Sequence, residues 1–300
     1  MVSPAVSPLV PNYANRIPYI TTAEYLADPN GVDTSNLVPD GSYQQNVTAL
    51  GSTIARASSW VDSQAYQVLA ATVDTQVGRY RMRSDGTIWV PVDQTPLVQV
   101  NAVSWGWYPG QLTTLTDLSA LWLQRKTVQV PLLSANGGIL TPPGAYAPAW
   151  PSPGDRVYVQ VTYVNGFANT TIPAATSAAA TSVVVASALG IVPGLPMTLT
   201  DGVNSETVTV GTGYTNGSTT VPISATVNSY LAGASLSSLP PAIKQACISL
   251  TTALVKVRGT AAFEMASITE QPGKQALIEA GGLEDLEIAI DLLEPFRRVR

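Results

Sequence analysis

The feature that most constrains this fold is an amphipathic stretch from Ser238 to Gly259, late in a 300-residue chain. Pro240 and Pro241 stand where a first helical turn tolerates missing N–H donors. Apolar side chains then recur every three or four residues on one helical face: Ile243, Cys247, Leu250, Leu254 and Val257. Burying each of them fully stabilises a protein by roughly 1.5–3 kcal/mol. Such a helix needs apolar partners elsewhere in the chain.

The N-terminal part of the sequence offers two partner helices. Thr21 and Glu24 form a capping-box pattern, which predicts a short helix from about Thr22 to Ala27. Asp40-Gly41-Ser42 then predicts the start of a longer helix that ends near Gln67. The apolar face of this longer helix is made by Val47, Leu50, Ile54, Ala57, Val61 and Ala65.

The C-terminal end supplies a further helix. Its apolar stripe precedes Pro295 and consists of Leu283, Leu286, Ile290 and Leu293. Because none of these helices can bury its apolar face alone, we expect helices from both ends of the chain to form one bundle. The predicted bundle core contains Leu50, Ile54, Val61, Ile243, Cys247, Leu250, Leu254, Leu286 and Ile290.

Between these helices the apolar period changes from that of a helix to that of a strand. A hairpin is predicted around Ser84-Asp85-Gly86. Further strands are predicted at Leu97–Trp107, Ala120–Gln124, Lys126–Val130 and Arg156–Val164. Between Val157 and Ile243 the only charged residues are Asp201 and Glu206, and glycines separate short strands, which predicts a small all-β unit.

The predicted fold is therefore α+β: a small helical bundle with a large all-β, sandwich- or barrel-like insertion between its second and third helices. We expect an extended N-terminal arm over 1–20 and a discontinuous helical domain over 21–67 and 238–294. A β-rich section would span 68–165, a small inserted β domain 166–237, and a C-terminal tail 295–300.

Composition argues against several classes of function. The chain has no histidine and one cysteine, so Ser-His and Cys-His catalysis and multi-cysteine zinc sites are excluded. No phosphate-binding, dinucleotide or calcium motif is present, and we expect no cofactor and no metal. A net charge of −5, with only 12% charged residues, disfavours wrapping of DNA or binding to an anionic membrane. The sequence predicts neither a signal peptide nor a bilayer-spanning helix.

Several clusters allow two interpretations. Trp105, Trp107, Trp122 and Trp150 fit strand packing, or a surface on which carbohydrate rings stack. Arg79, Arg81 and Arg83 alternate along a strand and share one face, which fits a solvated or interfacial face or a nucleic-acid contact. Glu284, Asp285 and Glu287 fit a solvated helix N-terminus, or a metal or acid–base site.

The last residues carry an aromatic side chain and several arginines beyond a proline. They fit a solvated tail, or a docking peptide for an acidic or carbonyl-rich groove in which the aromatic side chain is the anchor. The residues concerned are Phe296, Arg297, Arg298 and Arg300.

Four stretches of the helical part resemble head-to-tail connector (adaptor) proteins of tailed bacteriophages. Tyr19 to Leu26 contains a match to their "T-x-x-E-Y-L", and Ile54 to Asp62 resembles "I-x-x-A-S-x-x-I-D". Leu239 to Ala246 resembles "P-x-x-I-K-x-A", and Leu292 to Arg298 resembles "L-L-x-P-Y-R". The β section departs from the minimal family pattern, which is nearly all helical.

The resemblance implies a non-enzymatic structural protein of the virion neck, assembled in the host cytoplasm. Such a protein forms a ring of about a dozen copies beneath the portal, closed by head-to-tail contacts. It extends the channel through which DNA passes without specific binding, and it offers a docking face to a neck or tail-completion protein. The resemblance assigns contact with the portal to Phe296 and the arginines after it.

Two rival functions come from other classes. One is a phage tail or adhesin module that binds a glycan or another partner through the Trp-rich β section. The other is a hydrolase that uses a pair of carboxylates. A closed ring at the head–tail junction favours the adaptor, binding on a glycan array favours the adhesin, and loss of an activity on Asp-to-Asn substitution favours the hydrolase.

Overall fold

The computed structural model describes residues 17–124, 126–132, 151–257 and 282–298. It contains helices and several antiparallel sheets, so the chain is mixed α+β. Its contacts divide it into two compact units. Among the described residues, unit 1 is 71–166, and unit 2 comprises 17–70 together with 167–298. Residues 258 and 259, at the end of the predicted amphipathic stretch, lie outside the described part, as do Trp150 and Arg300.

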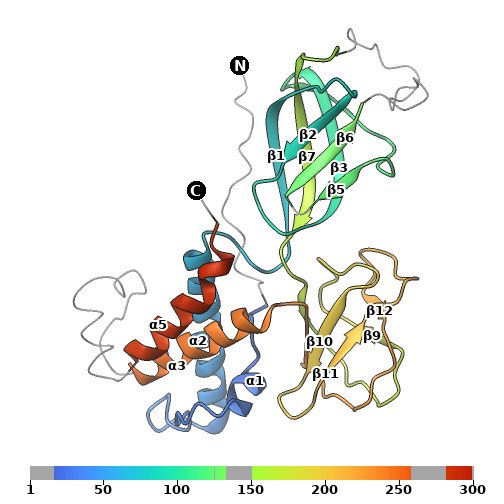
Figure 1. The fold of residues 1–300 in the computed structure, drawn as a ribbon. Helices are drawn as coiled ribbons and strands as arrows, with labels where there is room; N and C mark the ends of the chain where they lie inside the picture. Colours follow the sequence, from blue (N-terminus) through green and yellow to red (C-terminus); the bar gives the residue numbers. More distant parts are fainter. Residues whose placement is uncertain (1–16, 125, 133–150, 258–281, 299–300) are drawn as a thin grey trace. The chain divides into compact units, whose positions relative to one another are not determined.

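The helices of unit 2 come from both ends of the chain. In Figure 1 the blue helices α1 (Thr22–Ala27) and α2 (Tyr43–Ala65) lie beside the orange α3 (Pro241–Lys256) and the red α5 (Leu283–Leu293). A short 3₁₀ helix, η3 (Glu294–Phe296), follows α5. These bounds agree with the sequence prediction to within a few residues.

Capping explains where the first two helices begin. Thr21 and Glu24 form the predicted capping box of α1, each side chain accepting from the other's backbone N–H. Ser42 and Gln45 do the same for α2. The long helix ends at Tyr66, whose positive φ of 54° takes the chain out of the helical path.

One apolar cluster joins these helices. The hydroxyl groups of Tyr25 in α1 and Thr252 in α3 share a hydrogen bond of 3.1 Å. Ser58 Oγ of α2 lies 3.5 Å from Cys247 Sγ of α3. The cluster also receives Trp60, which is 4% exposed. The predicted core residues Leu50, Ile54, Val61, Ile243, Cys247, Leu250 and Leu286 are buried in it, and Leu254 and Ile290 are half-buried against it.

Unit 1 is built from two antiparallel sheets. The first has the order β1-β7-β3-β4, and the second has the order β2-β6-β5. Their strands are β1 (Thr72–Arg81), β2 (Thr87–Pro91), β3 (Leu97–Tyr108), β4 (Gln111–Thr114), β5 (Trp122–Gln124), β6 (Thr127–Pro131) and β7 (Arg156–Asn165). Along β7, Val157, Val159, Val161 and Tyr163 are buried in one core, so this strand turns alternate side chains inward.

The predicted hairpin at residues 80–90 is confirmed next to its turn, but its pairing does not extend along the two strands. The turn exists, and Gly86 adopts the positive φ of 76° that it requires. Met82 bridges Ile88, and the Arg83 N–H donates to the Thr87 carbonyl over 2.9 Å, whereas β1 pairs with β7 and β2 pairs with β6. The chain changes sheets here, because Met82 and Ile88 both enter the core between the sheets.

The small β domain of unit 2 has its own core. One sheet has the order β11-β10-β13-β8, and β12 and β9 form a second. The strands are β8 (Asn169–Thr171), β9 (Ser182–Val184), β10 (Pro196–Thr200), β11 (Ser205–Thr209), β12 (Thr220–Pro222) and β13 (Ser235–Ser237). The core includes Leu199, Val208, Val221, Tyr230 and Leu236. Because β13 leads into α3 within a few residues, this sheet is tied closely to the bundle.

Candidate interaction surfaces

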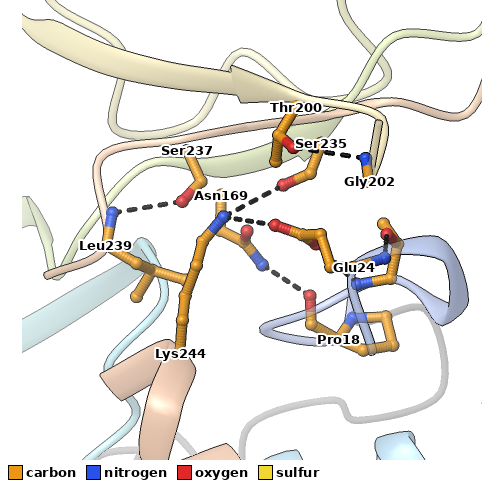
Figure 2. Close-up of polar contacts among 10 residues, drawn as sticks. Pro18, Glu24, Asn169, Thr200, Gly202, Ser235, Ser237, Leu239 and Lys244 are labelled. Atoms are coloured by element: carbon orange, nitrogen blue, oxygen red, sulfur yellow. Dashed lines mark hydrogen bonds and ion pairs between the residues drawn. The ribbon is translucent and has the colours of Figure 1, made fainter. Parts of the chain in front are cut away.

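An ion pair joins two helices of unit 2 at their junction with the small β domain. Figure 2 shows the ammonium group of Lys244, from α3, directed at Glu24 of α1 and Ser235 of β13. The Lys244 Nζ to Glu24 Oε1 distance is 2.7 Å, and the Nζ to Ser235 Oγ distance is 3.5 Å. The two charged side chains are 16% and 9% exposed. This partial burial makes the pair stronger than one on the surface.

The backbone approaches closely at the same junction. Gly202, in the turn after β10, has a φ of +90°, and a Cβ added there would lie 2.7 Å from the carbonyl oxygen of Ala23. Its N–H donates to Thr200 Oγ1 over 3.2 Å (Figure 2). Only glycine combines this backbone angle with the contact to α1.

The end of the predicted N-terminal arm is bound within unit 2. Asn169 of β8 donates to the carbonyl oxygen of Pro18 over 2.9 Å (Figure 2), and Tyr19 and Ile20 are buried in the helical cluster. The hydroxyl of Tyr19 donates to the buried carboxylate of Asp62 and accepts from the Ala70 N–H over 3.2 Å. Residues 17–20 are therefore a strap on their own chain, and the arm before them lies outside the described residues.

The predicted docking tail contacts the helical part of unit 2 through Phe296, Arg297 and Arg298. Phe296 is half-buried against the helical cluster, and its carbonyl accepts from Gln67 Nε2 over 3.0 Å. The Arg298 N–H donates to the carbonyl of Ala65 over 2.9 Å. The exposed Arg297 donates to Gln64 Oε1 over 3.3 Å. The last turn of α2 leaves backbone carbonyls without a partner inside the helix, and the tail residue Arg298 supplies a donor to one of them. Sequence patterns do not reveal this contact, because the two segments are far apart in the chain.

The tryptophans of unit 1 have different environments. Trp105 is 3% exposed in the core, and Trp107 is partly buried against it. Trp122 is 66% exposed and Trp89 is 39% exposed. Since only some of these rings reach solvent, the described tryptophans do not form one continuous stacking surface for a carbohydrate.

Four arginines of unit 1 lie on exposed positions of the sheet that contains β1 and β7, or just beyond it. We call Arg79, Arg81, Arg83 and Arg156 the arginine face; all four are exposed. The guanidinium of Arg79 lies 5.8 Å from the ring centre of Tyr158, and that of Arg83 lies 3.7 Å from Trp89. Arg81 stands directly opposite Arg156 in the strand register.

An acidic row lies on the exposed side of α5 in unit 2. We call its residues, Glu284, Glu287, Asp291 and Glu294, the acidic stripe; all are exposed. Their spacing of three and four residues places them on one side of the helix. Asp285 is different, because Lys256 Nζ lies 2.7 Å from its Oδ2. The predicted trio of Glu284, Asp285 and Glu287 is therefore divided between solvent and an ion pair.

Three further kinds of binding feature are a surface hollow, a group of metal ligands and a membrane-spanning helix. The small β domain has an open hollow of about 540 Å³ lined by Asp201, Val203, Asn204, Tyr230 and Leu231, among others. In the described ranges, no three His, Cys, Asp or Glu side chains are grouped closely enough to hold a metal ion. No helix in the described part of the chain is long and apolar enough to cross a bilayer.

Comparisons with known proteins identify no family. No family model matches the chain, and no curated protein matches it. Among solved structures, it is similar to one described as the neck of an empty GTA particle computed with C6 symmetry. The identity is 12%, 94% of each chain is covered, and the TM-score is 0.35. A likeness this low carries no weight for fold or function.

Proposed function

We propose that this protein is a structural adaptor of the neck of a tailed bacteriophage or a related particle. In this proposal several copies form a ring under the portal, and the ring extends the channel for DNA. It offers its outer surface to the next component of the neck. No chemical step belongs to this function.

The observation that carries the proposal is the position of the four stretches that resemble connector proteins. They fall in α1, in α2, at the start of α3 and at the end of α5, which are the segments that share the helical cluster of unit 2. Glu24 of the first stretch binds Lys244 of the third, and Tyr25 of the first stretch pairs with Thr252, later in α3.

The rest of the chain supports a passive role. The net charge is −5, so a channel lined by this protein repels DNA phosphates more than it binds them. Unit 1 and the small β domain have separate cores. In the proposal these β parts face other neck proteins, because the helical part is the portion that resembles the minimal connectors.

Contact with the portal is assigned to the C-terminal arginines. Because Phe296 packs on the bundle, deleting the whole tail would also damage the fold. The sharper variant replaces only Arg297, Arg298 and Arg300 with serine. We expect this variant to fold, to form rings, and to lose co-purification with assembled portal rings.

The matched control replaces Lys126, an exposed basic residue of unit 1, with serine. It removes a positive charge without touching the tail, and we expect its portal binding to equal that of the unaltered protein. Full portal binding by the tail variant refutes the assignment of the tail. Failure of the unaltered protein to bind any portal, together with the absence of rings, refutes the adaptor function itself.

A further inference from the structure

The arginine face of unit 1 has a charge arrangement that calls for an anionic partner. Arg81 and Arg156 are direct cross-strand neighbours, and like charges in this position are destabilising. Within the described residues, no carboxylate lies within 4 Å of the guanidinium of Arg79, Arg81, Arg83 or Arg156. The nearby carboxylate of Asp85 is attracted to Arg83 and offsets part of its charge. The like-charged pair of Arg81 and Arg156 is the part that a bound anionic group would stabilise.

The face is also ordered and accessible. Arg79 and Arg83 rest over the rings of Tyr158 and Trp89, which limits the freedom of their side chains. The strand β1 is at the edge of its sheet. Farther along the same face of β1, Val73 and Val77 are 50% and 51% exposed. An occupant must therefore combine negative charge with some apolar surface.

The acidic stripe of α5 has this combination. Among the described residues, its four carboxylates have no basic group within 4 Å, and Ile288, which is 43% exposed, lies beside them. From Glu284 to Glu294 the helix rises about 15 Å at 1.5 Å per residue. From Arg79 to Arg83 the chain advances about 13 Å at the usual rise of a strand. The two charged rows have similar lengths.

We propose that the arginine face of one copy binds the acidic stripe of a second copy of this chain. This inference rests on the proposed ring function and identifies the contact that closes the ring. Each copy carries one patch of each sign, so the contact is heterologous and propagates from copy to copy until the ring closes. The exposed Val77 and Ile288 add an apolar part that a DNA phosphate backbone does not provide.

The test uses two charge-reversal variants. Variant A carries Arg79→Glu and Arg81→Glu, and variant B carries Glu287→Lys and Asp291→Lys. We expect each variant alone to associate about 100-fold more weakly than the unaltered protein, because juxtaposed like charges oppose docking. Sizes are measured by mass photometry and native mass spectrometry. Circular dichroism checks the fold.

Mixing the variants gives the decisive result. In a 1:1 mixture, the reversed face of A meets the reversed stripe of B, and the unaltered stripe of A meets the unaltered face of B. We expect assemblies to return in the mixture and to contain equal numbers of A and B. Lys126→Glu, which reverses an exposed charge elsewhere in unit 1, is the control and should assemble normally.

The other outcomes each overturn the inference. If variants A and B assemble as the unaltered protein does, the ring contacts lie elsewhere and the adaptor proposal survives. If the 1:1 mixture does not assemble but a single chain with all four substitutions does, the two patches meet within one copy. If variant A assembles normally but no longer retains a double-stranded DNA probe, the arginine face is a nucleic-acid contact. An unaltered protein that never forms closed assemblies removes the adaptor proposal as well.

Discussion

The ion pair between Glu24 and Lys244 allows a quantitative test of how the two ends of the chain are held together. We propose a double-mutant cycle with Glu24→Gln, Lys244→Met and the combined variant. Glutamine keeps the capping box at the start of α1, since Gln at this position can also accept the Thr21 N–H. Methionine keeps most of the apolar stem of the lysine. The cycle thus isolates the charge interaction.

The expected coupling free energy follows from geometry and burial. The Nζ to Oε1 distance is 2.7 Å, and the side chains are 16% and 9% exposed. Exposed pairs give about 0–1 kcal/mol, whereas removal of one partner of a fully buried pair costs about 3–5 kcal/mol. We therefore expect a coupling of about 1–2 kcal/mol, with each single variant destabilised by a similar amount.

The assay is hydrogen exchange of peptides from α1 and α3, which reports the local opening free energy of the bundle. Global denaturation is less direct, because a chain with several cores need not unfold in two states. Glu24→Ala serves as the matched comparison and should cost about 0.5–1.5 kcal/mol more than Glu24→Gln, since it also removes the hydrogen bond from the Thr21 N–H. A coupling below about 0.3 kcal/mol, within the error of the cycle, contradicts this reasoning.

Three further predictions concern other parts of the chain. Tyr19→Phe removes the hydroxyl that binds the Asp62 carboxylate and the Ala70 N–H. Hydrogen exchange should show residues 17–20 and the end of α2 destabilised by about 2–4 kcal/mol, and an effect no larger than that of the exposed Tyr43→Phe contradicts this prediction. Leu250→Ala should destabilise the bundle by about 2–5 kcal/mol in hydrogen exchange, while Gln245→Ala on the exposed side of α3 should have little effect; equal effects of the two contradict the helical core. Burial raises the pKa of Tyr163 from 10.0 to about 12. The stability that its neutral form contributes is therefore complete below pH 10 and is lost as the pH rises to about 12. The melting temperature should fall over this range, less steeply in Tyr163→Phe, and identical pH profiles of the two proteins contradict this prediction.

The helices could be located from the sequence because their signals are local. The stripe from Ile243 to Leu254 and the cap at Thr21 each depend on residues within a few turns. The burial of Trp60 and the half-buried position of Phe296 depend on helices far away in sequence, which periodicity does not specify. The tail contacts with Gln67 and Ala65 were missed for the same reason.

The strands were harder to place, and their partners could not be predicted. Long apolar alternations such as β3 and β7 were located, but Asn169–Thr171 and Ser235–Ser237 have mainly polar side chains and were missed. Pairing depends on which core each strand faces, so the turn at Gly86 looked like a hairpin although its two strands belong to different sheets. The arginine pair at Arg81 and Arg156 became visible only with the register of β1 and β7.

The most direct test of the account is electron microscopy of assembled particles in which this protein is labelled by a bound antibody fragment. The account predicts a closed ring of this chain at the head–tail junction. In that ring, the helical part made by α2, α3 and α5 repeats around the axis. Label found on tail fibres or the host-facing tip, or copies that never close into a ring, would contradict the central claim.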